Sequence, residues 1–194
     1  MSGNRKKSSH DTALRRGASR LAAVQALYQL DMGGTSVNDV AEDFLTGALG
    51  GEVIAEDPVL ATETSVALVG LNAEMFTILL RGVDAHRAAL DGMINASLSK
   101  GWEASRLQPL LRNVLRLGIF ELRDRPDIPA KAVVSEYVDI ARAFFNDAEP
   151  GMVNAVLDRL ARTLRPHELS GGEAVAESIP ASAPHECPES SPAR

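Results

Sequence analysis

The sequence of 194 residues predicts an all-α protein on three observations. The apolar positions are mainly Leu, Ala and Val, and aromatic residues make up only 4%, a composition that favours helices over short strands. Apolar residues recur at spacings of three and four, the period of an amphipathic helix. Strict alternation of apolar and polar residues is not sustained anywhere, and the length fits one domain with or without tails.

The first half of the chain contains three expected helices. The first carries its apolar stripe over 21–28 and stops at Gly33-Gly34. A shorter one covers about 37–49, before the next glycine pair, and a long one covers about 72–98. Between the last two, residues 50–70 are acidic and weakly patterned, so we expect a loop with at most one helical turn.

The second half contains three better-defined helices. The stripe over 107–122 predicts the first, and a Pro-containing break follows it. Pro129 is suited to open the next helix, which runs to about Phe145. Pro150 marks the start of the last, which ends before Pro166. The connections are short, so neighbouring helices are expected to pack on one another.

The two ends of the chain differ from the middle in composition. Residues 1–20 hold six basic residues against one acid, whereas 21–80 hold nine acids and no Lys or Arg. We expect a flexible basic arm over 1–11, a folded domain over 12–167 and a disordered acidic tail over 168–194, which is rich in Ser and Pro.

Several classes of protein are excluded by what the sequence lacks. The single cysteine, Cys187, excludes a disulfide framework and a CxxC metal site. No apolar run reaches the roughly 18 residues of a membrane span, and the basic start is not followed by the apolar core of a secretion signal. We therefore expect a soluble cytoplasmic protein.

Catalytic and cofactor motifs are also missing from the sequence. It has no glycine-rich phosphate loop, no GxSxG and no HExxH, and its four histidines are scattered. Carboxylate pairs such as Glu136 and Asp139 are typical of solvated helix faces. We expect no metal, no cofactor and no enzymatic activity.

The remaining candidate for function is the first helix. Arg16 and Arg20 are four residues apart and are expected to share a face, with Arg15 beside it and Tyr28 two turns beyond Arg20. Arginines followed by an aromatic ring can hold phosphates and stack a base, as in recognition of single-stranded RNA. Two other interpretations stay open: a solvated arm that binds nothing, and a core position for Tyr28 on the stripe of Val24.

Four segments resemble the NusB family of bacterial transcription antitermination factors. They are AVQALYQLD from Ala23, preceded by Arg16 and Arg20, then VLRLGIFEL from Val114, DIPAKAVVSEYVDIARAF from Asp127 and MVNAVLDRL from Met152. The similarity spans about 12–166, with the segments in the order of the family and near its spacing.

The resemblance implies an all-helical, compact fold of two packed three-helix halves without catalytic activity. It implies binding of boxA-type RNA in nascent transcripts, notably ribosomal RNA, together with the ribosomal protein NusE, which keeps the RNA polymerase elongation complex resistant to termination. It also implies an RNA-binding role for Arg15, Arg16, Arg20 and Tyr28. Met152 lies where the family often has an aromatic residue near RNA.

The sequence departs from the family in two places. Residues 17–19 are Gly, Ala and Ser where further arginines are common, so weaker intrinsic RNA affinity is expected. The stretch 46–70 is longer and more acidic than expected. Two alternatives to antitermination remain: a self-associating interaction module, for example a homodimer that hides its RNA face, and a detached NusB-like domain of an RNA cytosine methyltransferase.

Overall fold

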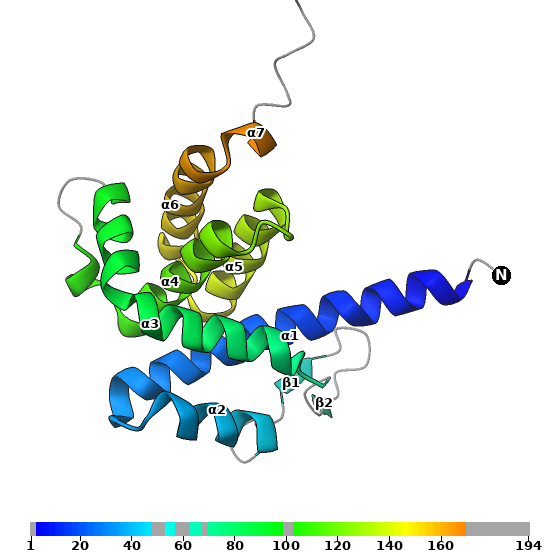
Figure 1. Ribbon diagram of the computed structural model, residues 1–194. Coiled ribbons are helices and arrows are strands. Elements are labelled where there is room, and N and C mark those ends of the chain that lie inside the picture. The colour runs from blue at the N-terminus through cyan, green and yellow to red at the C-terminus, as the bar shows by residue number, and fades with distance from the viewer. Residues whose placement is uncertain (1–2, 48–52, 57–62, 67–69, 99–102, 170–194) are drawn as a thin grey trace, which may run out of the picture.

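The computed structural model describes residues 3–47, 53–56, 63–66, 70–98 and 103–169. These residues are mostly helical, which confirms the all-α prediction (Figure 1). The helices are α1 (Gly3–Gly33), α2 (Val37–Thr46), α3 (Ala73–Ser97), α4 (Pro109–Asp124), α5 (Ala130–Phe144), α6 (Glu149–Leu164) and α7 (Pro166–Leu169), and a 3-10 turn, η1 (Ala104–Arg106), precedes α4.

The six long helices form the two expected halves. Helices α1, α2 and α3 contact one another, and so do α4, α5 and α6. Helix α4 joins the halves because it also packs against α1 and α3 (Figure 1). All its residues from Asn113 to Leu122 are buried, so α4 is the centre of the core.

Two glycines let other helices approach α4 closely. A Cβ at Gly82 of α3 would lie 2.0 Å from the ring of Phe120, and one at Gly118 of α4 would lie 2.8 Å from a methyl group of Leu157 on α6. Both distances are far below van der Waals contact. Only glycine fits at these two positions without a shift of the neighbouring side chain.

The helix boundaries follow ordinary capping chemistry. The side chains of Ser36 and Asn72 accept hydrogen bonds from backbone N–H groups in the first turns of α2 and α3. Gly34 and Gly47 have φ of 65° and 79° directly after α1 and α2, a left-handed conformation that favours glycine. Pro129 precedes the first residue of α5, close to its expected role.

The described part of α1 extends beyond the expected folded domain at its N-terminal end. Helix α1 begins at Gly3, so residues 3–11, expected to be flexible, continue the first helix. This segment contains no proline, and a helix already formed further along the chain gains one hydrogen bond for each residue added. At the other end α7 continues to Leu169, and residues 170–194 of the expected tail lie outside the described residues.

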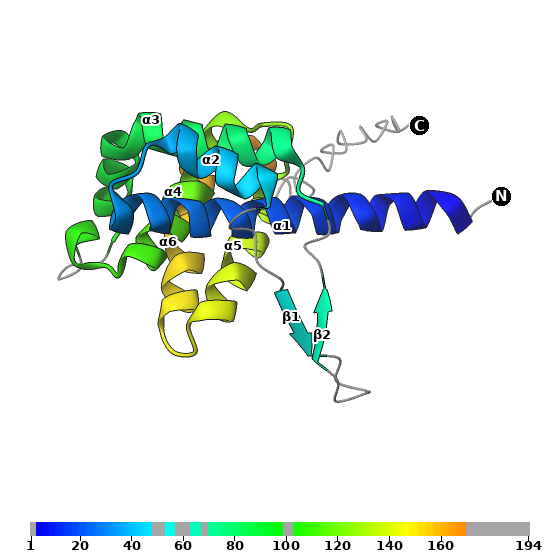
Figure 2. The ribbon, with the colours of Figure 1, turned by 90° about the horizontal axis from the view of Figure 1, so that it is seen from below.

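The expected loop over 50–70 contains a β-hairpin. Strands β1 (Val53–Glu56) and β2 (Glu63–Val66) pair antiparallel, with Val53 opposite Val66. Figure 2 shows the hairpin standing apart from the helices. The segments VIAE and ETSV are rich in β-branched residues, which favour strands, but each is too short to show a period by itself.

Candidate RNA-binding surface

The basic segment of α1 offers two exposed arginines. Arg15 and Arg16 are exposed, and their guanidinium groups form no ion pair within the described residues. Arg16 lies close enough to the α4–α5 connection to influence Asp127. The pKa of Asp127 lies below its usual range because Arg125 donates hydrogen bonds to its carboxylate, and the charge of Arg16 adds to the effect. Because both arginines are exposed and form no ion pair with the described residues, their guanidinium groups are available to phosphate groups.

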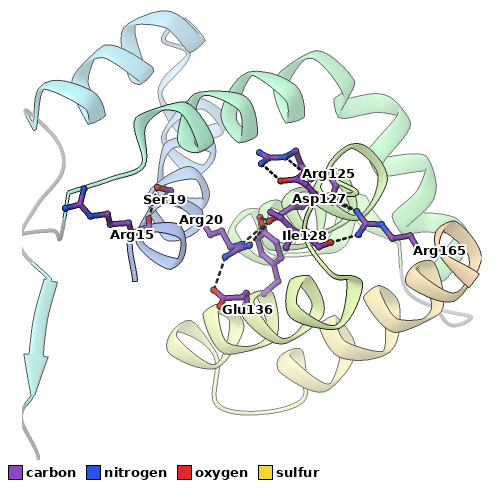
Figure 3. A network of polar contacts seen from close by, with 10 residues as sticks. Arg15, Ser19, Arg20, Arg125, Asp127, Ile128, Glu136 and Arg165 are labelled. Atoms are coloured by element: carbon purple, nitrogen blue, oxygen red, sulfur yellow. Dashed lines mark hydrogen bonds and ion pairs between the residues drawn. The ribbon is translucent and has the colours of Figure 1, made fainter. Parts of the chain in front are cut away.

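Arg20, in contrast, is buried, with 3% of its surface exposed. Its Nε and Nη2 donate to the two carboxylate oxygens of Glu121 at 3.0 and 2.6 Å, and its Nη1 donates to Glu136 at 3.1 Å (Figure 3). Burial by itself would lower the pKa of Arg20, but the hydrogen bonds and charge of Glu121 outweigh burial and raise it. Arg16 and Arg20 were expected to project from one face of the helix; Arg16 is exposed, whereas Arg20 points into the core between α4 and α5.

Glu121 is the centre of this buried group. Its Oε2 also accepts a hydrogen bond from the hydroxyl of Tyr137 at 2.8 Å, and neither residue is exposed. Burial raises the pKa of Tyr137, and the nearby charge of Glu121 raises it further. Sequence reasoning missed Glu121, although a single acid within the apolar run VLRLGIFEL indicates a buried cation nearby.

Tyr28 lies on the surface of α1 with 41% of its area exposed, while its neighbours Val24 and Leu27 are buried. The interpretation of Tyr28 as a core residue is therefore wrong. Leu14 and Met32 are also exposed and fall on nearly the same face of the helix as Tyr28. Arg16 precedes Tyr28 by 12 residues, which is about 18 Å along the axis and roughly 120° around it. A single RNA strand that contacts both Arg16 and Tyr28 must therefore cross α1 obliquely.

Met152 lies away from α1, on α6, where it faces the end of α3 across a cavity. It is half-buried and lines a cavity of about 270 Å³. Arg159, also in the lining, donates a hydrogen bond to the carbonyl oxygen of Ser97 at 3.1 Å. No residue of α1 lines this cavity. The structure thus brings together Arg15 and Arg16, but places Tyr28 and Met152 on separate surfaces.

A second polar cluster fixes the far end of α1. The carboxylate of Asp31 accepts hydrogen bonds from Arg87, Asn113 and Arg116, and Arg112 lies 3.7 Å away. Burial would raise the pKa of Asp31, but these groups, Arg87 above all, lower it. The cluster connects α1 to α3 and α4. Its arginines are already paired with carboxylates.

Across the described ranges, no three His, Cys, Asp or Glu side chains gather in a way that could hold a metal ion. Within those ranges every helix is too short or too polar to cross a lipid bilayer.

Comparisons with known proteins agree with the fold and with the sequence resemblance. Residues 17–162 match the model of the NusB family. A protein of Rhodospirillum rubrum named transcription antitermination protein NusB is 48% identical over 168 residues, with 82% of this chain and 89% of the relative covered. A protein of the same name from Rhodopseudomonas palustris is 46% identical over 160 residues, with the same coverage.

Solved structures share the fold. NusB of T. maritima superposes with a TM-score of 0.61 at 25% identity and covers 80% of this chain and 96% of its own. A second structure, titled as antitermination factors NusB and NusE in complex with dsRNA, gives a TM-score of 0.56 at 22% identity and covers 78% and 98%.

Proposed function

The chain belongs to the NusB family, and on that premise we propose that it is a transcription antitermination factor that binds boxA-type RNA together with NusE. In this role it binds and does not catalyse, and it acts in the cytoplasm on nascent transcripts such as ribosomal RNA. The RNA polymerase elongation complex is reached indirectly, through the assembled RNA and NusE.

Three kinds of observation support this proposal. Relatives at 46–48% identity carry the antitermination name, and a structural neighbour is titled as a complex with NusE and RNA. On this chain, the observation that carries the proposal is the pair of exposed guanidinium groups of Arg15 and Arg16, which form no ion pair with the described residues, on the helix that also presents Tyr28. Arginine binds phosphate and an exposed ring stacks on an unpaired base.

We assign the proposed RNA contacts to Arg15, Arg16 and Tyr28, with Met152 as a separate contact beside the α3–α6 cavity. Arg20 is left out of the contacts because it is buried and already paired with Glu121. With two arginines in place of a longer basic run, the RNA affinity of the protein alone is expected to be modest. NusE is then needed to complete the binding surface.

The test is fluorescence anisotropy of a labelled boxA RNA. The RNA is titrated with this protein alone, with NusE alone, and with both proteins at two salt concentrations. Markedly tighter, salt-dependent binding with both proteins supports the proposal, and a scrambled RNA of equal length is the control. Equal affinity for the mixture and for either protein alone contradicts it.

A second candidate function is self-association. Leu14 and Met32 are 47% and 65% exposed and lie on nearly the same face of α1 as Tyr28, so a second copy could cover this face. Sedimentation velocity at micromolar concentration separates monomer from dimer. A dimer that dissociates when RNA is added indicates a store of the RNA-binding form, whereas one that persists favours an interaction module. The remaining alternative, a methyltransferase fragment, gains no support from relatives named as antitermination proteins.

A further inference from the structure

Helix α1 leaves the helical body at two adjacent residues, Ser19 and Arg20. Residues 11–16 are exposed, whereas Ser19 and Arg20 are 0% and 3% exposed. Figures 1 and 2 both show the N-terminal half of α1 extending beyond the other helices. Ser19 and Arg20 are thus the first buried polar contacts behind the basic segment.

The two residues attach α1 to three other helices. The hydroxyl of Ser19 accepts a hydrogen bond from the N–H of Asn72, the N-cap residue of α3, at 2.9 Å. Arg20 donates hydrogen bonds to Glu121 on α4 and to Glu136 on α5, and Figure 3 shows its side chain directed toward Glu136. Attachment to three helices restricts both the tilt and the rotation of α1 at this point.

The contact between Arg20 and Glu121 is a bidentate guanidinium–carboxylate pair, which fixes the relative orientation of the two side chains. Two parallel N–H···O bonds join a planar guanidinium to a carboxylate, and this arrangement tolerates little rotation. The hydroxyl of Tyr137 holds the same carboxylate from α5. Apolar side chains of the same volume often stabilise a protein core as much as a buried ion pair does, so stability alone does not account for this pair.

We propose that Ser19 and Arg20 form a clamp that sets the direction of the basic end of α1, and that RNA affinity depends on the clamp although neither side chain contacts RNA. The inference rests on the proposed function. Arg15 and Arg16 lie within about one turn of the clamp, so their positions follow its orientation. Holding them in place before binding avoids the entropy that would otherwise be lost on binding.

The variant Glu121→Gln tests the clamp because the two possible roles of Arg20 predict opposite results. If Arg20 is a positioning residue, loss of the Glu121 charge releases α1 and weakens RNA binding by about tenfold. The dependence on salt stays unchanged, because the phosphate contacts of Arg15 and Arg16 remain. If Arg20 instead binds RNA directly, freeing its charge leaves the affinity equal or makes it tighter, which would overturn the proposal.

A matched control separates the clamp from overall charge. Asp158→Asn removes one negative charge from an exposed position of α6, where Asp158 pairs with Arg162. Its RNA affinity is expected to equal that of the original protein. A loss in Asp158→Asn as large as that in Glu121→Gln would also count against the clamp.

Direct measurement of the orientation uses spin labels. Cys187→Ser removes the single native cysteine, and Ala13→Cys and Ala143→Cys then place one label on the exposed end of α1 and one on α5. Pulsed EPR is expected to give a narrow distance distribution for this protein and a broader one when Glu121→Gln is added. Equal widths would overturn the proposal.

If circular dichroism shows that Glu121→Gln is unfolded, a milder variant can test the clamp in its place. Tyr137→Phe removes only the hydroxyl that holds Glu121, and it is expected to weaken RNA binding by about two- to threefold and to broaden the same distance distribution. Tyr137→Phe with unchanged affinity and width contradicts the clamp. If the original protein shows no cooperative RNA binding with NusE, the proposed function fails instead, and the EPR result still decides whether the clamp orients α1.

Discussion

Arg165 and Glu168, one turn apart at the C-terminal end of the described chain, together close the connection between α4 and α5. Arg165 is buried and donates hydrogen bonds to the carbonyl oxygens of Glu121, Leu122, Arg125 and Ile128, at 2.6–2.9 Å. Glu168 accepts a hydrogen bond from the N–H of Ala130 at 2.8 Å. One side chain thus caps the end of α4 and the other caps the start of α5.

Arg165→Ala is expected to lower the free energy of unfolding by about 3–5 kcal/mol, because it removes four hydrogen bonds to carbonyl oxygens. The carbonyls of Glu121 and Arg125 keep their backbone donors, whereas those of Leu122 and Ile128 lose the guanidinium that donates to them. Urea unfolding followed by circular dichroism measures the change. Arg162→Ala, which removes an exposed arginine one turn earlier, is the control and should change it by less than about 0.5 kcal/mol. Similar losses in both variants would mean that the cap contributes little.

Arg15 and Arg16 are expected to supply phosphate contacts. Replacing both with Ala should weaken RNA binding and lower the slope of log affinity against log salt by about 1.4, at about 0.7 for each contact to single-stranded RNA. Anisotropy titrations at four salt concentrations measure the slope. The control, Arg142→Ala with Arg162→Ala, removes two exposed arginines from α5 and α6. An unchanged slope in the Arg15 and Arg16 variant would exclude these residues as contacts.

Tyr28 is expected to stack on a base. Tyr28→Ala should cost about 1–3 kcal/mol of RNA binding free energy, whereas Tyr28→Phe keeps the ring and should cost little. Met32→Ala, four residues along the same face, controls for loss of exposed apolar surface. Equal losses for Ala and Phe at position 28 would show that the hydroxyl, and not the ring, carries the contact.

The helices could be predicted from the sequence because their information is local. The apolar period and the Gly and Pro residues placed α2 to α6 close to their observed ranges. The hairpin was missed because two strands of four residues are shorter than the pattern that identifies a strand.

The candidate site was harder to predict because it depends on contacts between distant segments. Spacing placed Arg16 and Arg20 on one face of a helix, but whether that face is covered depends on Glu121, which is 101 residues away from Arg20. Tyr28 and Val24 are also four residues apart, and here the edge of the core falls between them. A helical wheel gives the angle between two side chains but not which angles a neighbouring helix covers.

Gly82 and Gly92 make a matched pair within α3. Gly82→Ala is expected to destabilise the protein by about 1–3 kcal/mol, since the new methyl group overlaps the ring of Phe120. Gly92 has no neighbouring atom within 4 Å of an added Cβ, so Gly92→Ala should stabilise the helix by about 0.5–1 kcal/mol. Urea midpoints of the two variants test the opposite signs. The same sign for both would contradict the close approach of α3 to α4.

Asp31 is expected to make the stability of the protein depend on acid pH. Its pKa in the folded protein is lowered from the ordinary 3.8, because the hydrogen bonds from Arg87 and Asn113 and the nearby arginine charges outweigh burial. The unfolded protein therefore binds the proton more readily. The stabilisation is complete well above pH 3.8 and is lost as the pH falls through the lower, folded pKa.

Urea unfolding at several pH values between 7 and 2.5 measures this dependence, with Asp31→Asn as the test variant. The variant is less stable at neutral pH, because it leaves the arginines of the cluster without their carboxylate, and its free energy of unfolding should fall less steeply below pH 4 than that of the original protein. Asp139→Asn, an exposed carboxylate paired with Arg142, is the control and should keep the original slope. Parallel curves for the original protein and Asp31→Asn would show that other carboxylates carry the acid dependence. The first to examine would then be Glu168, whose pKa is lowered chiefly by the hydrogen bond from the N–H of Ala130.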